Sequence, residues 1–356
     1  GIMLNRGTVS IAINPGASPV NDSLMVDGQL VTMDVPAGPY VRVEALGASL
    51  IIGDGGVELS GSFAFEQITR PDNTQIVKFG VNDIVVAIDG QGLKKGRGGF
   101  VITPAGIAGI LEGEIDIAAG PVNASGKLGL RINKTGAAVD EFVIVGEDTI
   151  DIKFSDLERD LIAFYGSDLS FKIGDFVTIE GNVSFSSSGG VDIFAGSELL
   201  VFLGKGPAKL ASGDFNPDAT GVLLSNAKVG LIRFADGSLA LNAEGLVEIV
   251  GITGVSLAGT ASIRFNNSGQ AVDQTLTIPN TTDDIVVRFE NAAPFASFSA
   301  TNVALTVAGQ TLMGDFSFGT IASGPYAGSI RVTAANVSLN LGDGAVTMNN
   351  AGGTLL

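Results

Sequence analysis

The chain contains no cysteine, no histidine and no tryptophan, and only 16% of its 356 residues are charged. Without cysteine the chain has neither disulfides nor thiolate metal ligands. Without histidine it also lacks the commonest general base and the imidazole metal ligands. The carboxylates that remain do not mark any particular catalytic pair in the sequence. We therefore predict that the protein is not an enzyme.

Basic residues are also scarce, because 20 Lys and Arg stand against 37 Asp and Glu, and the net charge is −17. Nucleic-acid binding depends on clustered basic side chains that neutralise phosphates, so nucleic acid is not a predicted partner. The one basic cluster, Lys94, Lys95 and Arg97, is expected to form a solvated turn. No segment resembles an uncharged transmembrane span. An acidic surface keeps molecules apart and attracts cations, which predicts an extracellular or cell-surface location.

The residues that are abundant favour strands and tight turns. The chain has 50 glycines and is rich in Val, Ile, Thr, Ser and Asn, while 45% of its residues are hydrophobic. β-branched residues fit pleated sheets, and Gly and Asn fit turns. This composition predicts an all-β fold with enough apolar surface for a core.

The sequence repeats itself three times. Corresponding segments begin TVSIAIN at Thr8, KLGLRIN at Lys127 and TASIRFN at Thr260. A second set of corresponding segments follows in each copy: SGSFAF (60–65), EGNVSF (180–185) and MGDFSF (313–318). Because both sets are offset by nearly the same number of residues, we predict three tandem units. Their predicted bounds are 1–126, 127–259 and 260–356, the third being truncated.

Shorter strand–turn–strand patterns within the repeats predict β-hairpins. In the opening strand, Val9, Ile11 and Ile13 alternate with smaller or polar residues, so we expect one buried and one solvated face. The segment 220–234 is apolar on both faces, which predicts a strand packed between layers. The predicted architecture is an elongated β-solenoid-like rod or a stack of β-sandwich modules. Its predicted partners are neighbouring repeats of the same or identical chains.

One segment has a helix-like start that the repeat argues against. Ser155 and Glu158 have the spacing of a capping box at the start of 155–166. The corresponding segment 36–47 contains two prolines, which oppose a helix. Equivalent parts of a repeat normally share their structure. We therefore do not expect a long helix there.

Acidic turns are the candidate metal sites. Calcium prefers several oxygen ligands, and carboxylates in glycine-rich turns supply them. The alternative is that Asp favours turns because it bonds its own backbone. The predicted calcium ligands are Asp54, Asp214, Asp218, Asp236 and Asp343.

The segments LSGSFAFEQ, VGLIRFADGSLALNAEG and VSLAGTASIRFNNSGQAVDQ together resemble the repeats of giant bacterial cell-surface proteins of the adhesin-like kind. The resemblance implies export, an extended shape and a surface or matrix role. We therefore predict a structural or adhesive extender segment.

Two other functions stay open. Successive amphipathic hairpins also resemble the repeating units of bacterial envelope lipid-bridge proteins, which would make the chain a lipid-carrying β-groove. An open apolar trough would support this hypothesis, and a closed, filled core would exclude it. A carbohydrate-binding or carbohydrate-active module, with surface polysaccharide as its partner, would need exposed aromatic residues. The chain offers only Tyr40, Tyr165 and Tyr326 besides phenylalanine.

Overall fold

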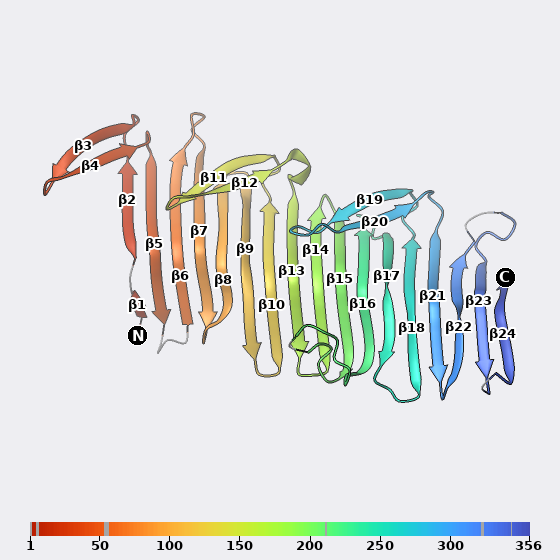
Figure 1. Cartoon of the computed structure of the whole chain (residues 1–356). Helices are drawn as coiled ribbons and strands as arrows, with labels where there is room; N and C mark the ends of the chain where they lie inside the picture. Colours follow the sequence, from red (N-terminus) through yellow and green to blue (C-terminus); the bar gives the residue numbers. More distant parts are fainter. Residues whose placement is uncertain (1, 5–6, 53–56, 211, 322–323, 343) are drawn as a thin grey trace. The chain divides into compact units, whose positions relative to one another are not determined.

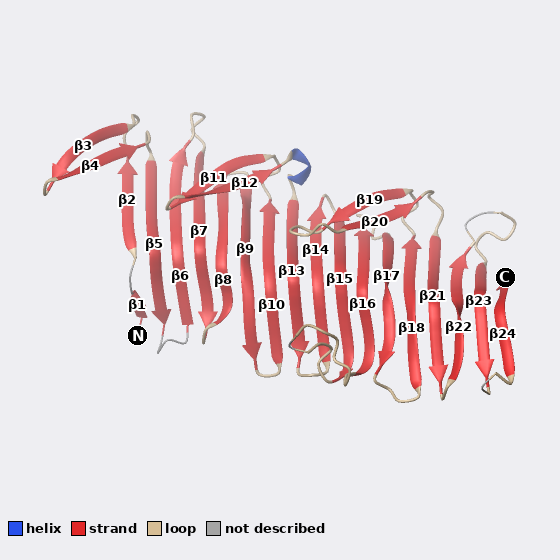
Figure 2. Cartoon of the chain, viewed as in Figure 1, coloured by secondary structure: helices blue, strands red, loops and turns tan. Residues whose placement is uncertain are grey.

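The computed structural model describes residues 2–4, 7–52, 57–210, 212–321, 324–342 and 344–356. Within these ranges the chain forms 24 strands and one short 3-10 helix, and it is all-β as predicted (Figure 2). The strands belong to two compact units. Unit 1 comprises Gly1–Ile117 and Lys127–Phe164, and unit 2 comprises Ala118–Gly126 and Tyr165–Leu356. Strands β9 (Gly106–Ala119), β10 (Val122–Asn133) and β13 (Leu161–Ile173) contribute residues to both.

Unit 1 is based on one antiparallel sheet of long strands that follow chain order (Figure 1). Its strands are β1 (Ile2–Leu4), β2 (Thr8–Asn14), β5 (Tyr40–Ile52), β6 (Val57–Thr69), β7 (Gln75–Ile88), β8 (Gln91–Thr103) and β9 (Gly106–Ala119). Strands β2 and β5 to β9 pair in that order, and β1 also pairs with β5. Two hairpins leave this sheet: β3 (Val20–Val26) with β4 (Gln29–Val35), and β11 (Val139–Val145) with β12 (Asp148–Phe154).

The β11–β12 hairpin packs on β6, β7 and β8 and closes the core of unit 1. Val143 and Ile152 on its inner side are fully buried. The hairpin lies so close to the sheet that a Cβ atom on Gly80 would be 2.6 Å from Cγ2 of Val145. A Cβ on Gly99 would lie 2.8 Å from Cγ1 of Val143. Glycine at these two positions therefore allows the second layer to form.

Unit 2 repeats this arrangement. Its sheet contains β14 (Val177–Ser188), β15 (Val191–Lys205), β16 (Thr220–Arg233), β17 (Leu239–Val250), β18 (Val255–Asn266), β21 (Phe295–Val307), β22 (Gln310–Thr320), β23 (Ile330–Leu341) and β24 (Val346–Leu355). Hairpin β19 (Val272–Thr277) and β20 (Asp284–Phe289) covers β15 to β17. A further core forms where the loop 206–219 places Ala208 and Ala219 against Phe202 and Leu223.

The corner between each opening strand and its hairpin is held by the same residue type. Asn14, Asn133 and Asn266 end β2, β10 and β18, and all three are buried. Each side-chain amide donates to the carbonyl four residues later, and each side-chain oxygen accepts from the N–H two residues later. The asparagine thus satisfies backbone groups that the turn would otherwise leave unpaired.

Two local expectations can be compared directly with the structure. In 155–166 only Asp156–Glu158 is helical, as one 3-10 turn, and β13 begins at Leu161, so the absence of a long helix is confirmed. The predicted turn at the basic cluster is wrong, because those residues lie within β8. There Lys94 pairs with Asp116 at 3.0 Å across the sheet. Cross-strand pairing therefore overrode a local glycine-rich turn signal.

The expected burial of the opening strand is also wrong. Val9, Ile11 and Ile13 are 61 to 64% exposed. The segment 220–234 is likewise covered on one side only, because Leu223 and Ile232 are buried while Val222 is 48% exposed. The hairpins form a second layer on one face of each sheet, and no described residues form a comparable layer on the other.

Candidate functional site

The two faces of each sheet differ in chemistry. In unit 1 the face that carries the β11–β12 hairpin holds the charged side chains, including Arg42, Glu44 and Lys78. Side chains alternate along a strand, so the residues between these point to the opposite side. We call this opposite side the open face.

In unit 1 the open face is made of apolar residues that line up across neighbouring strands. The cross-strand register defines one row of Ile11, Val43, Phe65, Phe79 and Phe100. The adjacent row consists of Ala45, Phe63, Val81, Gly98 and Leu111. Neither row contains a charged residue. Phe79 at the centre is 40% exposed.

Unit 2 has an open face of the same kind. One row crosses nine strands without a charged residue: Val183, Gly196, Val229, Ala243, Ile263, Phe298, Phe318, Val332 and Leu355. The rings of Phe298 and Phe318 have centroids 6.3 Å apart. With Ile263, Phe265 and Ile330 they line a hollow of about 320 Å³. The open face of unit 2 is therefore apolar and, at this point, indented.

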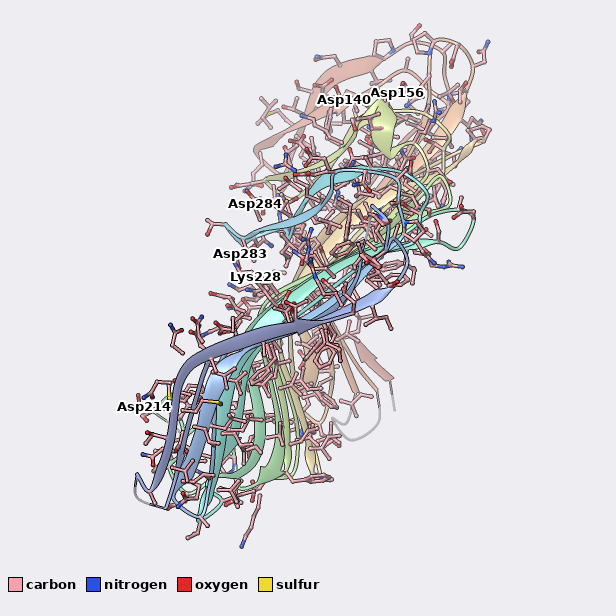
Figure 3. All side chains as sticks on the ribbon, turned by 90° about the vertical axis from the view of Figure 1, so that its right-hand side faces the viewer. Asp140, Asp156, Asp214, Lys228, Asp283 and Asp284 are labelled. Atoms are coloured by element: carbon pink, nitrogen blue, oxygen red, sulfur yellow. The ribbon has the colours of Figure 1, made fainter. Side chains whose placement is uncertain are left out.

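Charged groups of unit 2 gather on the other side of the sheet. Asp214, Lys228, Asp283 and Asp284 lie on the same side of the ribbon in Figure 3. Lys228 alternates with Val229 of the open row, and its cross-strand partner is Glu244. These charged groups of unit 2 are thus kept away from its apolar row.

In unit 1, charges next to the hairpin are paired rather than free. Glu141 of β11 accepts from Lys78 at 2.8 Å and also pairs with Arg70. Lys78 lies over the Phe142 ring, 4.8 Å from its centroid. At the neighbouring Tyr40, burial and the hydrogen bond to Glu66 raise the phenol pKa above its ordinary value. These side chains hold the hairpin against the sheet.

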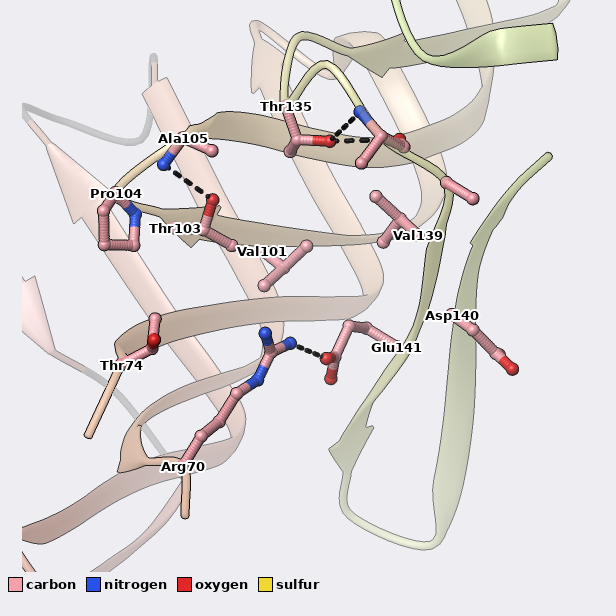
Figure 4. Close-up of a pocket in the computed structure, with 12 residues that line it drawn as sticks. Arg70, Thr74, Val101, Thr103, Pro104, Ala105, Thr135, Val139, Asp140 and Glu141 are labelled. Carbon is pink, nitrogen blue, oxygen red and sulfur yellow. Dashed lines mark hydrogen bonds and ion pairs between the residues drawn. The ribbon is translucent and has the colours of Figure 1, made fainter. Parts of the chain in front are cut away.

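A hollow of about 510 Å³, lined by both polar and apolar side chains, lies beside the base of this hairpin. Arg70, Thr103, Val139 and Glu141 are among the residues that line it (Figure 4). The Arg70 guanidinium is directed at the Glu141 carboxylate, which it shares with Lys78. The charged groups of the hollow are thus already engaged in ion pairs within the protein.

The predicted calcium ligands lie at separate turns. Asp214 and Asp218 share the loop 206–219, where the Asp214 carboxylate accepts from the Ser212 hydroxyl at 2.9 Å. Asp236 lies in another turn and accepts from the N–H and hydroxyl of Ser238 at 2.9 and 2.6 Å. These hydrogen bonds hold the pKa of Asp236 below its ordinary value. The other two predicted ligands, Asp54 and Asp343, lie outside the described residues.

Calcium binding stays a prediction. Among the described residues no group of three carboxylates is arranged to hold a metal ion. Thermal unfolding in calcium and in chelator tests it, because an ion that binds only the folded state raises Tm.

Of the three tyrosines that a sugar-binding platform could use, Tyr40 and Tyr165 are buried, and only Tyr326 is exposed. The tyrosines therefore do not form an aromatic platform.

Comparisons of the chain with protein-family models, with curated proteins and with solved structures find no match. No helix in the described ranges is long and apolar enough to span a bilayer.

The phenylalanine rows were not predicted from the sequence, although alternating pairs such as Phe63/Phe65 and Phe316/Phe318 indicate them. The open face is the most extensive chemical feature of both units.

Proposed function

We propose that the open face binds the acyl chains of lipids, so that the chain acts as a lipid-carrying β-sheet. The observation that carries this proposal is the set of uncharged cross-strand rows on an uncovered face, seen in both units. Monomeric soluble proteins rarely leave contiguous apolar surfaces of this kind without a partner.

The chemistry of the rows suits hydrocarbon better than sugar or nucleic acid. The side chains of Ile263, Phe298 and Phe318 offer no hydrogen-bond donor or acceptor. A sugar hydroxyl placed there would lose its bonds to water without replacement, whereas an acyl chain has none to lose. The alternative of a carbohydrate module is correspondingly disfavoured.

The dimensions of the rows also fit. At about 4.8 Å per strand, the nine-strand row of unit 2 is about 38 Å long. One leaflet of a bilayer contains about 15 Å of hydrocarbon, half the bilayer core. An acyl chain lying across the strands therefore has room to contact apolar side chains along its whole length.

The energy of covering the face is sufficient for binding. Phe318 is 47% exposed, so an acyl chain would cover about 90 Å² of an aromatic side chain of about 200 Å². At about 25 cal/mol per Å² this contributes about 2 kcal/mol, or about 30-fold in affinity. Several such side chains per acyl chain would offset the loss of freedom on binding.

A fluorescent-acyl phospholipid with a zwitterionic head group tests the proposal, since the chain itself is strongly negative. We expect saturable binding that the double variant Phe298→Asp/Phe318→Asp abolishes. The control for added acid is Val286→Asp, which introduces one aspartate on the exposed side of β20, where Val286 is 45% exposed; each single variant, Phe298→Asp and Phe318→Asp, is compared with it at equal charge. Unchanged binding by the double variant would refute the proposal.

A second copy of the chain is the competing occupant of this face. Sedimentation of the lipid-free protein distinguishes the two. A monomer that binds lipid supports the proposal. A dimer that the same double variant dissociates would assign the open face to self-association instead.

A structural or adhesive extender of an extracellular or cell-surface protein is the second candidate. It is supported by the recurrence of the hairpin layer in both units, which provides a means of joining repeats. Small-angle scattering tests it, since an extender requires an elongated particle and a compact particle would contradict it.

A further inference from the structure

We infer that the β3–β4 hairpin is a docking element, and that its partner is a separate antiparallel sheet constructed like β6–β8. This sheet would carry glycine or alanine under the hairpin and a basic residue opposite Asp22. The inference does not depend on lipid binding, because it concerns the hairpin and not the open face.

The hairpin occupies a position equivalent to two others that are docked. β3, β11 and β19 each follow a buried asparagine corner and begin at Val20, Val139 and Val272. Their registers also agree, because Asp22 pairs with Met33 as Glu141 pairs with Ile152. β3–β4 is therefore built like the docked hairpins.

What differs is the covering layer. Leu24 is 47% exposed, whereas its equivalents Val143 and Leu276 are 0% and 5% exposed. Met33 is also exposed, while its equivalent Ile152 is fully buried. The inner side of β3–β4 thus has the apolar pattern of a docked hairpin without a sheet beneath it.

The two docked hairpins show how a hairpin and its sheet are matched. Glu141 faces Lys78 in unit 1. In unit 2 the equivalent positions are Gln274 and Ile193, so the acid and the base are replaced together. β3 carries Asp22 at this position, and an acid there fits only a sheet with a basic partner.

Close approach sets the second requirement. A Cβ on Gly230 of unit 2 would lie 2.6 Å from Cγ2 of Val287. This is the same distance as that between a Cβ on Gly80 and Cγ2 of Val145 in unit 1. At the positions equivalent to Gly80 and Gly99, the sheet formed by β22, β23 and β24 carries Thr333 and Thr354, which are cross-strand partners. Their side chains would collide with a hairpin docked in this way, so β22–β24 of another copy is not the partner.

A hairpin transplant tests the complementarity. Residues 20–35 and 139–154 have equal lengths, so the first segment can replace the second within the intact chain. We expect the transplanted hairpin to dock on β6–β8, with hydrogen-exchange protection within about tenfold of the wild-type β11–β12 hairpin. The matched control carries Leu24→Asp in the transplant and should lose that protection. Exchange as fast as that of the native β3–β4 hairpin would overturn the inference.

A second measurement gives the hairpin a sheet in its natural position. In a chain of residues 1–126 followed by residues 8–356, the second β3–β4 hairpin follows a complete β6–β8 sheet. Met25→Leu in the first copy marks its peptides by mass. We expect slower exchange in the second copy than in the first. Equal exchange in both copies would overturn the inference even if the transplant failed to fold.

Discussion

Gly80→Ala is the sharpest test of the hairpin layer. Gly80 lies in β7 outside the left-handed region, so its backbone can accept alanine without strain. Its added Cβ would lie 2.6 Å from Cγ2 of Val145 and 2.9 Å from Cγ1 of Val143. Both distances are far below an ordinary carbon–carbon contact of about 3.5–4.0 Å. The substitution therefore forces the β11–β12 hairpin away from the sheet.

The expected size of this effect comes from two opposing contributions. Overpacking a core by one methyl group costs about 1–3 kcal/mol. Replacing glycine by alanine within a strand gains about 0.5–1 kcal/mol. The clash exceeds the gain over most of this range, so we expect a net loss of about 1 kcal/mol and a several-fold larger hairpin-opening constant.

Amide exchange of the 139–154 segment is the appropriate assay, because it measures local opening. A thermal melt reports the unfolding of the whole chain and would not isolate the opening of this hairpin. The control is Gly353→Ala in β24, where no atom lies near the added Cβ and only the gain should appear. Gly230→Ala should reproduce the effect at β19–β20 in unit 2. If Gly80→Ala leaves 139–154 as protected as in the wild type, the hairpin is not in contact with the sheet.

Three further substitutions probe the contacts on either side of the β11–β12 hairpin. Asn133→Ala should cost about 1–3 kcal/mol, measured by denaturant unfolding, because it leaves buried backbone groups unpaired. Lys78→Ile should speed amide exchange of β11–β12. Adding Glu141→Gln should restore the protection, because the pair then matches Gln274 and Ile193 of unit 2. If the double variant exchanges as fast as Lys78→Ile, hairpin and sheet are not matched at this pair. At Glu158, burial raises the carboxyl pKa, but hydrogen bonds from a backbone N–H and Arg131 outweigh it, and the pKa is lowered. Its stabilising contribution is then present at neutral pH and is lost as pH falls through the folded-state pKa, so the stability difference between wild type and Glu158→Gln should vanish in acid.

The repeat pattern aligned the corners from which the hairpins start, although it did not predict the hairpins themselves, because the same residues recur at the same local positions. Asn14, Asn133 and Asn266 correspond in the sequence, and each ends a strand and holds a hairpin corner. Comparison with the equivalent segment 36–47 also correctly excluded a long helix at 155–166. Local backbone structure can therefore be predicted from one sequence when internal repeats allow equivalent segments to be compared.

Comparison of the sequence copies could not predict which face of each sheet is covered by a second layer. The alternation of Val9, Ile11 and Ile13 correctly indicates an apolar side, but periodicity does not show whether a layer lies on it. Which face the hairpin covers depends on the Gly80 and Gly99 contacts, which join residues more than 40 positions apart. The candidate site was missed for the same reason, because the row through Phe65, Phe79 and Phe100 exists only after the strands have paired.

The open face and the hairpin layer are linked by one physical requirement. A single sheet has two faces, and an apolar face must be covered by protein, by lipid or by another copy. The hairpins cover one face locally with short segments of the chain, so the sheet acquires a core without a second full sheet. The other face then needs no protein partner for folding, and its apolar rows are free for a ligand. Binding at Phe298 and Phe318 of β21 and β22 should therefore respond to substitutions on the open face and stay unchanged when Gly230→Ala disturbs the hairpin that covers β15 to β17 on the other face. Equal loss of lipid in both variants would show that the two faces are not independent.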